Sequence, residues 1–365
     1  MIVLSSQIIK RAQNGQFSLI AEIGVNHFDI AKKMSISPLA AAKLMIDKAH
    51  EAGVHAVKFQ SYKAEKLASK NSPSYWDTSE ESTQSQYELF KKYDSFSFEH
   101  YKELSEYSKE IGIEFLSTAF DFESADYLAE LMNVYKISSS DLTNHPFIVY
   151  QAKKNKPILL SVGASDKDEI DEAVNLIKAN SSQPIVLLHC ILEYPTPYHH
   201  ANLNRITSLR NNYPDLIIGY SDHTKPDLHA DVIKTAFNLG AIVVEKHFTL
   251  DKTLPGNDHY HAMDEKDAKR IIHGVKFVKE LQGSHEIEHL ESEIEARNNA
   301  RRSIVSNKHI KKGELVTHSM LSFKRPGIGI PPSHIDRVIG MFAAKDISND
   351  EIIKYEMLSN KPNKG

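Results

Sequence analysis

The chain has 365 residues, which is more than one typical domain and suggests a large domain with a small one. Its residues are 41% hydrophobic and 25% charged, the composition of a soluble globular protein. Its net charge of −4 comes without a basic tail or patch, so the sequence argues against nucleic acid as a partner. The single cysteine, Cys190, excludes an intrachain disulfide, and no apolar run is long enough for a membrane span. The N-terminus lacks a secretory pattern, and we therefore expect a cytoplasmic protein.

Apolar or β-branched runs alternate with helical patterns over most of the chain. The runs that we expect to form strands are 18–23, 55–59, 114–118, 134–137, 158–162, 185–189, 217–221 and 243–246. The helices expected between and after them are 38–53, 98–112, 122–131, 146–155, 167–179, 203–213, 227–239 and 265–281. Eight such units in about 280 residues favour a (β/α)8 barrel over an open doubly wound sheet.

Polar side chains gather at the carboxyl ends of these runs, where barrel enzymes place their active sites. They are Glu22, Asn26, His27, Lys58, Gln60, Thr118, Lys136, Ser138, Ser139, Asp141, Ser161, His189, Tyr194, Ser221, Asp222, His223, Glu245, Lys246 and His247. The amino ends show no comparable pattern, whereas a purely structural role would predict polarity at both ends. We therefore expect the carboxyl ends to form a catalytic rim.

His223 and His247 close two successive runs, and each follows other ionisable residues. Because neighbouring parallel strands lie about 4.8 Å apart, two such imidazoles can share one divalent ion. Lys58 and Lys136 follow apolar residues, where an unpaired ammonium is costly to bury. Each lysine alone is equally well explained by an ion pair with Glu22 or Glu245, but the pair favours an anionic substrate.

Two loops and the C-terminal region have less specific patterns. The turn-rich segment around Asp258 either reaches over the barrel mouth or simply connects two elements. The segment 61–95, which contains Trp76, is either a lid or interface, or a helix pair packed on the barrel. Residues 1–283 thus form the expected barrel domain, 284–300 a charged linker, and 301–365 a small module of short strands and turns.

Several motifs spread over the chain carry a family resemblance. They are AEIGVNH at 21–27, VKFQ at 57–60, YKISS at 135–139, YPTP at 194–197, GYSDHT at 219–224, EKHFTLD at 245–251 and KRPG at 324–327. With these motifs the chain resembles the sialic acid synthases and their relatives that make legionaminic and pseudaminic acids. The resemblance implies a TIM barrel followed by an antifreeze-like (SAF) domain. It also implies condensation of phosphoenolpyruvate with an open-chain N-acylated hexose, which gives a nine-carbon 2-keto acid and releases phosphate by C–O cleavage.

The resemblance also implies residue roles. His223 and His247 would hold Mn²⁺ or Mg²⁺, and Glu245 would support these ligands or a water. Glu22 and Asp258 would hold sugar hydroxyls, with Glu22 the first candidate for acid–base chemistry. Phosphoenolpyruvate would be bound by Lys58, Lys136, Ser139, Ser161, Ser221, Tyr194 and Thr118. In a domain-swapped homodimer, Arg325 would contact the N-acyl group in the partner's site.

Departures from the family pattern lie near the expected sugar. They are the insertion at 28–37, Leu192, the run at 256–263 and Ile328, and they leave open whether the acceptor is N-acetylmannosamine or a 2,4-diacetamido-trideoxyhexose. Other function classes also remain: a metal-dependent barrel hydrolase, an aldolase using Lys136 or Lys246 as a Schiff base, and a carbohydrate-binding protein. The hydrolase is disfavoured because no His-x-His pair follows the first run, and simple binding is disfavoured by the polar rim.

Overall fold

The structure is a computed structural model that describes residues 5–76, 78–256 and 258–361. The chain divides into two compact units, Met1–Gly283 and Ser284–Gly365. Within the described residues, every helix is too short or too polar to cross a membrane.

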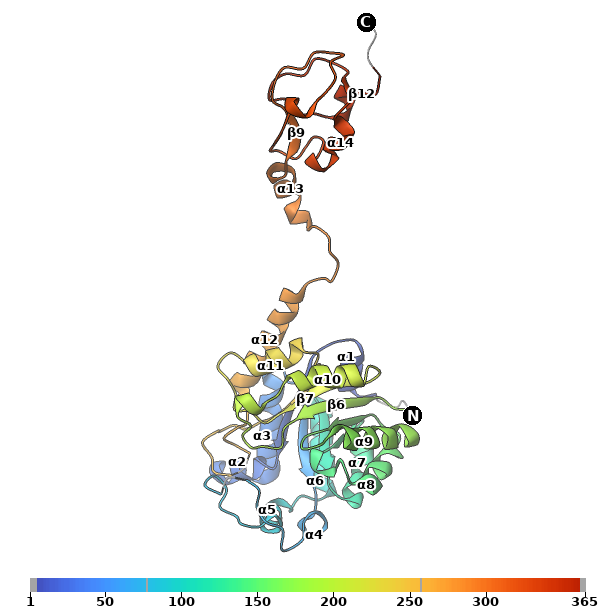
Figure 1. The fold of residues 1–365 in the computed structure, drawn as a ribbon. Coiled ribbons are helices and arrows are strands. Elements are labelled where there is room, and N and C mark those ends of the chain that lie inside the picture. The colour runs from blue at the N-terminus through green and yellow to red at the C-terminus, as the bar shows by residue number, and fades with distance from the viewer. Residues whose placement is uncertain (1–4, 77, 257, 362–365) are drawn as a thin grey trace. The chain divides into compact units, whose positions relative to one another are not determined.

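The first unit is built on eight parallel strands that close into a barrel in sequence order (Figure 1). The strands are β1 Ser18–Gly24, β2 Ala56–Ser61, β3 Glu114–Ala119, β4 Tyr135–Ile137, β5 Ile158–Ser161, β6 Ile185–Cys190, β7 Ile217–Asp222 and β8 Val243–His247. Closure occurs at β1, where Glu22 is in register with Lys58 of β2 on one side and His247 of β8 on the other. The predicted (β/α)8 barrel is confirmed.

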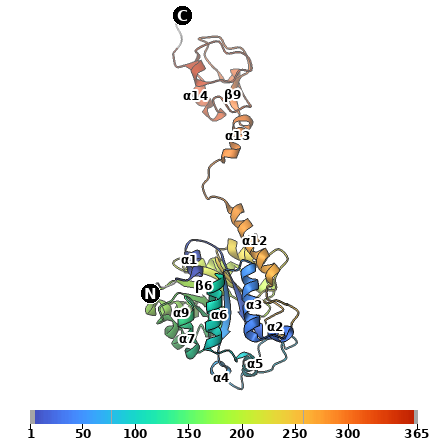
Figure 2. The ribbon, with the colours of Figure 1, turned by 180° about the vertical axis from the view of Figure 1, so that it is seen from behind.

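Most helices of this unit surround the barrel and pack on the outward-facing apolar residues of the strands. They are α2 His27–Met34, α3 Pro38–Glu51, α6 Phe98–Ile111, α7 Phe122–Leu131, α8 His145–Ala152, α9 Lys167–Asn180, α10 Asn204–Asn212, α11 Asp231–Asn238 and α12 Glu265–Gln282. Two shorter helices, α4 Ala64–Leu67 and α5 Gln86–Tyr93, lie at one end of the barrel. Figure 2 shows α3 and α6 side by side on one flank. Local capping fixes several starts: the Ser37 hydroxyl accepts the Ala40 N–H before Pro38, and Asp166 and Glu169 form a capping box.

Two expected helices are shorter in the structure. The helix predicted from 227 begins only at Asp231, because the Asp227 carboxylate accepts N–H groups of His229, Asp231 and Val232 and so forms a turn ahead of the helix. The helix predicted to 155 ends at Ala152, and Asn155 adopts a left-handed backbone with φ of 55°.

The amino end of the barrel is closed by α1 (Gln7–Gln13), which the sequence patterns did not predict. Ile8, Ile9 and Ala12 of α1 are buried against inward-facing residues of the strands, and the Ile8 N–H donates to Glu114 Oε2 at 2.8 Å. Both views place α1 at the opposite end of the barrel from α4 and α5. The open end is therefore the one formed by the carboxyl ends of the strands.

The second unit contains small antiparallel sheets, as predicted for the C-terminal module. Its elements are α13 Ile294–Ala300, β9 Ser303–Ser306, β10 Leu321–Lys324, α14 Ile335–Val338, β11 Phe342–Ala343 and β12 Leu358–Ser359, with 3-10 turns at 291–293, 318–320, 332–334 and 355–357. β9 pairs with β10, and β11 pairs with β12. Their side chains enclose a separate apolar core that includes Ile304, Val316, Val338 and Ile353.

Candidate active site

The carboxyl ends of the strands surround a small cavity of about 60 Å³ that is lined mainly by polar side chains. The lining residues are Glu22, Lys58, Gln60, Thr118, Phe120, Lys136, Ser138, Ser139, Ser161, Cys190, Leu192, Tyr194, Ser221, His223, Glu245 and His247. The structure thus brings together all of the residues predicted to act in catalysis or to bind phosphoenolpyruvate. Of the sugar-binding candidates, Asp258 lies beside this cavity, 3.8 Å from His247, and Arg325 belongs to the second unit.

Two lysines and two carboxylates form a buried charge cluster in this cavity. Lys58 Nζ lies 2.6 Å from Glu22 Oε2 and 3.8 Å from Glu245 Oε1, and Lys136 Nζ also lies 3.8 Å from Glu245 Oε1. Lys58 Nζ further donates to Thr118 Oγ1 at 2.9 Å. The ion pairs with Glu22 and Glu245 are thus present, and both lysines also line the cavity, so the binding of an anionic substrate by this pair stays a prediction.

The two carboxylates have opposite pKa shifts. Burial raises the pKa of Glu22 to about 7, an effect that the Lys58 ammonium opposes and the Glu245 carboxylate reinforces. Burial also disfavours the ionised form of Glu245, but the ammonium groups of Lys136 and Lys58 outweigh it and lower the pKa of that carboxyl. A pair of groups with separated pKa values is typical of acid–base sites. Glu245 is a permanent anion, whereas Glu22 can exchange a proton near neutral pH.

Serine hydroxyl groups, among them those of Ser139, Ser161 and Ser221, line the same cavity as the lysine pair. Ser161 Oγ is buried and has no hydrogen-bond partner among the described residues. Ser139 Oγ accepts the Gly163 N–H at 2.8 Å, and Ser221 Oγ donates to Glu245 Oε1 at 3.3 Å. A Cβ added at Gly163 would lie 3.0 Å from Ser139 Oγ, so glycine allows the backbone to approach this hydroxyl closely. Hydroxyls and ammonium groups together suit a phosphate or carboxylate.

Imidazoles cluster on one side of the cavity. The rings of His223 and His247 have centroids 5.5 Å apart, and the His261 ring lies 4.8 Å from that of His247 and 6.3 Å from that of His223. His247 Nδ1 is 3.8 Å from Asp258 Oδ2, and one ligand atom from each of His247, Asp258 and His261 lies within 4.8 Å of the others. Nitrogen and carboxylate donors of this kind fit a divalent transition metal. Sequence reasoning missed His261, whose only signal was its place in the divergent run at 256–263.

A larger cavity of about 580 Å³ opens beside the small one and shares Gln60, Tyr194, His247 and other residues with it. Asp258 lines this larger cavity, so its loop does reach over the barrel mouth; Asn257 lies outside the described residues. The segment 61–95 contributes much of the wall through Tyr62, Leu67, Tyr75, Gln86, Leu89, Phe90 and Tyr93. The helices α4 and α5 of this segment therefore line a cavity rather than only packing on the barrel.

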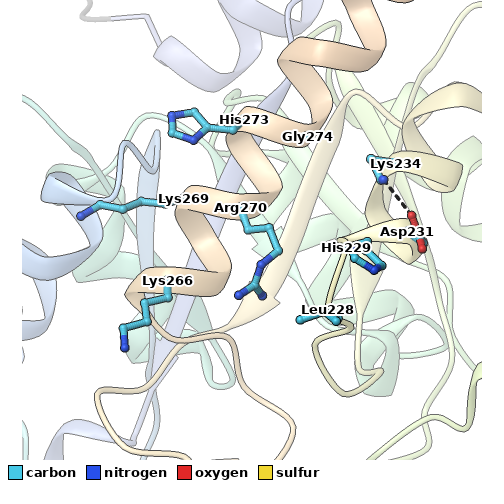
Figure 3. Close-up of a pocket in the computed structure, with 9 residues that line it drawn as sticks. All are labelled: Leu228, His229, Asp231, Lys234, Lys266, Lys269, Arg270, His273 and Gly274. Carbon is cyan, nitrogen blue, oxygen red and sulfur yellow. Dashed lines mark ion pairs between the residues drawn. The ribbon is translucent and has the colours of Figure 1, made fainter.

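A third hollow lies on the outer surface between α11 and α12 and measures about 880 Å³ (Figure 3). Its Lys234 pairs with Asp231 and its Arg270 with Asp267, each at 2.7 Å. Figure 3 shows Lys269 and His273 pointing away from α11. The groove contains none of the predicted site residues, and its cations are largely neutralised or solvated. The barrel mouth is thus the candidate active site.

Some polar residues at strand ends serve the structure instead. Lys246 forms a buried ion pair with Asp222 at 2.5 Å, which argues against a Schiff-base role for this lysine. His189 Nε2 is 2.8 Å from the Ala201 carbonyl oxygen, and the His27 ring packs against Phe28 and Phe96. Arg325 belongs to the second unit and is exposed just after β10.

The motifs, the closed barrel and the C-terminal sheets agree with two family models, the NeuB family over residues 45–287 and the SAF domain over residues 301–359. The chain belongs to the NeuB family. This NeuB-family chain is 37% identical over 342 residues to the N,N'-diacetyllegionaminic acid synthase of Campylobacter jejuni, a match that covers 92% of this chain and 98% of that protein. It is 30% identical over 345 residues to the human N-acetylneuraminate-9-phosphate synthase, covering 94% of this chain and 92% of that protein.

A solved structure is similar to the NeuB-family chain in both fold and sequence. The N-acetylneuraminic acid synthetase of Leptospira borgpetersenii has a TM-score of 0.66 and 31% identity, covering 78% of this chain and 92% of that one. The expected resemblance to this family of synthases is therefore confirmed, and with it the expectation of an enzyme of the transferase type.

Proposed function

We propose that the chain is a nonulosonic acid synthase, which condenses phosphoenolpyruvate with an open-chain N-acylated hexose to give a nine-carbon 2-keto acid and phosphate. The observation that carries this proposal is the pair of joined cavities at the barrel mouth. The small one is lined by buried lysines and hydroxyls, and the larger one is lined by aromatic and aliphatic side chains together with about as many polar ones. A His-rich cluster lies where they meet, so an anion and a sugar can be held on either side of it.

The small cavity supplies the phosphoenolpyruvate site. Lys58 and Lys136 provide positive charge, and Thr118, Ser139, Ser161, Ser221 and Tyr194 provide hydroxyl groups around them. Without substrate the ammonium groups face Glu22 and Glu245, and the bound trianion would compete with these carboxylates for the same lysines. This competition raises the proton affinity of Glu22 further when the substrate is present.

His223 and His247 would hold a divalent ion, Mn²⁺ or Mg²⁺, at the junction of the two cavities. Both rings face the small cavity, and the donor set of imidazole and nearby carboxylate suits such an ion. When bound, the ion supplies Lewis-acid polarisation of a carbonyl oxygen. His223 Nδ1 is 2.7 Å from the Ile191 carbonyl oxygen, a contact that orients the ring with its other nitrogen free to ligate.

The chain's own residues would then transfer a proton and stabilise charge during the reaction. Carbon 3 of phosphoenolpyruvate bonds to the aldehyde carbon, whose oxygen takes up a proton, and water adds at carbon 2. The tetrahedral intermediate loses phosphate by C–O cleavage and becomes the ketone, so the equation balances with one water consumed. Glu22, with its pKa raised to about 7, exchanges a proton with a reacting oxygen, while the permanent anion Glu245 stabilises positive charge developing at carbon 2.

The larger cavity indicates the kind of acceptor. Its walls include Leu67, Leu89 and Phe90 beside polar groups such as Gln86 and Ser140, and among the described residues its charged or ionisable groups are Asp29, Asp141, Asp258 and the shared His247. A 2,4-diacetamido-trideoxyhexose has two acyl groups and a methyl group for such walls, and N-acetylmannosamine offers more hydroxyls. The similarity to a diacetyllegionaminic acid synthase supports the same choice. By the family resemblance, Asp258 binds a sugar hydroxyl and Arg325 of a partner chain contacts the N-acyl group in a domain-swapped homodimer.

Phosphate release from phosphoenolpyruvate tests this proposal. With Mn²⁺ present, release should require an acceptor sugar, stop on addition of EDTA, and proceed with a higher kcat/KM for the 2,4-diacetamido sugars than for N-acetylmannosamine. No release with any of these acceptors would overturn the proposal. Reduction by borohydride in the presence of a keto substrate, giving a covalent adduct at Lys136, would instead establish the aldolase alternative.

A further inference from the structure

We propose that His261 is a third imidazole ligand of the divalent ion, beside His223 and His247. This inference rests on the proposed function in placing an ion at the barrel mouth, but it goes beyond the two histidines that the family resemblance implies. His261 belongs to the run at 256–263, which diverges from the family pattern.

The first observation is an unsatisfied side chain. His261 has an exposed fraction of 0%, and within the part of the chain that the structure describes neither of its ring nitrogens has a hydrogen-bond partner. Buried polar atoms in folded proteins are nearly always paired with protein, water or an ion. The His261 ring is therefore missing a partner, and its neighbours decide what that partner is.

The second observation is the geometry of those neighbours. The ring centroids of His261 lie 4.8 Å from His247 and 6.3 Å from His223, and those two are 5.5 Å apart. With metal–nitrogen bonds of about 2.1 Å, the centroids of two imidazoles on one ion can be at most about 6.4 Å apart, so all three separations allow a shared ion. Donor atoms on one ion lie at most about 4.2 Å apart. His247, Asp258 and His261 each offer a donor atom within 4.8 Å of the other two, so this set needs to contract by less than an ångström; His223 is not part of the set and joins it only through its ring separations from the other two histidines.

The loop that carries His261 is held in place by contacts from both sides. The Met263 N–H donates to the His247 carbonyl at 2.7 Å, and the Tyr260 hydroxyl donates to the Tyr194 carbonyl at 2.7 Å. Between these anchors, the Tyr194 ring packs against His261 with centroids 5.6 Å apart. The imidazole is thus positioned before any ion arrives, as effective ligand sites require.

His27 provides an internal comparison. It is also buried with both ring nitrogens unpaired among the described residues, but its ring contacts are Phe28, Phe59 and Phe96, at centroid distances of 4.3, 5.6 and 4.7 Å. That environment is apolar packing with no converging donors. A missing partner alone does not make a ligand; His261 differs from His27 because imidazole and carboxylate donors converge on it.

A third imidazole changes what the site binds. Three nitrogen donors hold a divalent ion more tightly before either substrate is present, and they favour Mn²⁺, Fe²⁺, Co²⁺ or Zn²⁺ over the oxygen-preferring Mg²⁺. The remaining coordination positions stay open for substrate oxygens, as in catalytic metal sites.

The test uses the full-length chain stripped of metal, Mn²⁺ as the probe, and neither phosphoenolpyruvate nor sugar. Free Mn²⁺ measured by electron paramagnetic resonance gives Kd for the unsubstituted chain, His261→Ala, His261→Gln and the control His27→Ala. We expect both His261 variants to raise Kd at least about tenfold and the control to leave it within about twofold. Circular dichroism of each variant shows whether its fold is retained.

A direct count of ligands completes the experiment. With ¹⁵N-histidine in the unsubstituted chain, pulsed resonance spectra should show three imidazole nitrogens coupled to Mn²⁺, and two in His261→Gln. An unchanged Kd in folded variants, or a count of two in the unsubstituted chain, would overturn the inference. Because no substrate is used, three nitrogens without phosphate release would refute only the proposed function, and phosphate release with two nitrogens would refute only the role of His261.

Discussion

Glu22 and Glu245 share Lys58, yet burial dominates at Glu22 and positive charge dominates at Glu245. Because the pKa of Glu22 rises from its usual 4.5 to about 7 on folding, the folded chain holds this proton more tightly than the unfolded chain. The contribution of Glu22 to stability is therefore fully present below about pH 4.5 and is lost as pH rises to about 7.

The substitution Glu22→Gln removes this titration. We expect the free energy of unfolding of Glu22→Gln, relative to the unsubstituted chain, to rise by roughly 1–3 kcal/mol between pH 5 and pH 8. Urea denaturation of both proteins at the two pH values measures the difference. Parallel pH dependences would show that Glu22 keeps an ordinary pKa, and they would remove it as the proton-exchanging group.

A substitution at Ser161 is expected to change substrate binding without changing the stability of the fold. Its hydroxyl has no partner among the described residues, so Ser161→Ala removes no internal hydrogen bond but deprives the phosphoenolpyruvate site of a donor. A hydrogen bond to a charged group is worth about 1.5–3 kcal/mol, so KM for phosphoenolpyruvate should rise roughly tenfold or more while KM for the sugar and the melting temperature change little. Initial-rate kinetics and thermal denaturation check both parts.

The control is Ser117→Ala, which breaks the buried Ser61–Ser117 hydroxyl contact of 2.7 Å outside the cavity. This variant should lose stability without a change in KM for phosphoenolpyruvate. If Ser161→Ala behaved like the control, Ser161 would be a structural residue.

The helix α5 offers a test of acceptor recognition because its residues differ in position. Phe90 lines the larger cavity and packs against Tyr62, whereas Tyr87 on the same helix does not line it. Phe90→Ala should raise KM for a 2,4-diacetamido acceptor by roughly tenfold, the loss expected for about 1–2 kcal/mol of apolar contact, and should affect N-acetylmannosamine less. Tyr87→Ala is the matched control. Equal losses for both sugars would remove Phe90 as a selectivity residue.

Sequence patterns predict an element well when its residues are all buried or alternate regularly between a buried and an exposed face. The eight strands lie within two residues of the expected runs because barrel strands are buried on both faces and read as continuous apolar segments. The candidate rim followed from the same topology, since the carboxyl ends of all strands converge at one end. The helix α1 was missed because its seven residues are too few for a periodic signal, and it is stabilised by contact with the barrel floor.

Loop residues were predictable only in part. Asp258 was identified through a family motif, but the sequence does not show that its carboxylate comes within 3.8 Å of His247. No periodic pattern or motif pointed to His261. Its position is set by hydrogen bonds from Tyr260 to Tyr194 and from Met263 to His247, which join segments that are distant in the sequence. Contacts between residues far apart in sequence are what local patterns cannot encode.

In a dimer of chains that each carry a barrel and an SAF domain, Arg325 could contact the active site of its own barrel or that of its partner. Arg325 is exposed, but the turn after it is held firmly: the Gly327 N–H donates to the Asn298 carbonyl and the Ser303 hydroxyl donates to the Pro326 carbonyl, each at 2.7 Å. An exposed guanidinium next to a fixed turn is suited to donate to an acyl oxygen presented by another surface. In the proposed domain-swapped homodimer, that surface belongs to the partner's barrel.

Mixing two inactive chains tests this arrangement. His247→Ala disables the barrel site and leaves Arg325 intact, whereas Arg325→Ala does the reverse, so a heterodimer has one complete site only if the arginine crosses to the partner. Refolding the two variants together at equal amounts makes half of the dimers mixed, and phosphate release should recover to about a quarter of the unsubstituted level. Each variant refolded alone is the control. If Arg325 served its own chain's barrel, every site would lack one group and no activity would return, even though size-exclusion chromatography still showed a dimer.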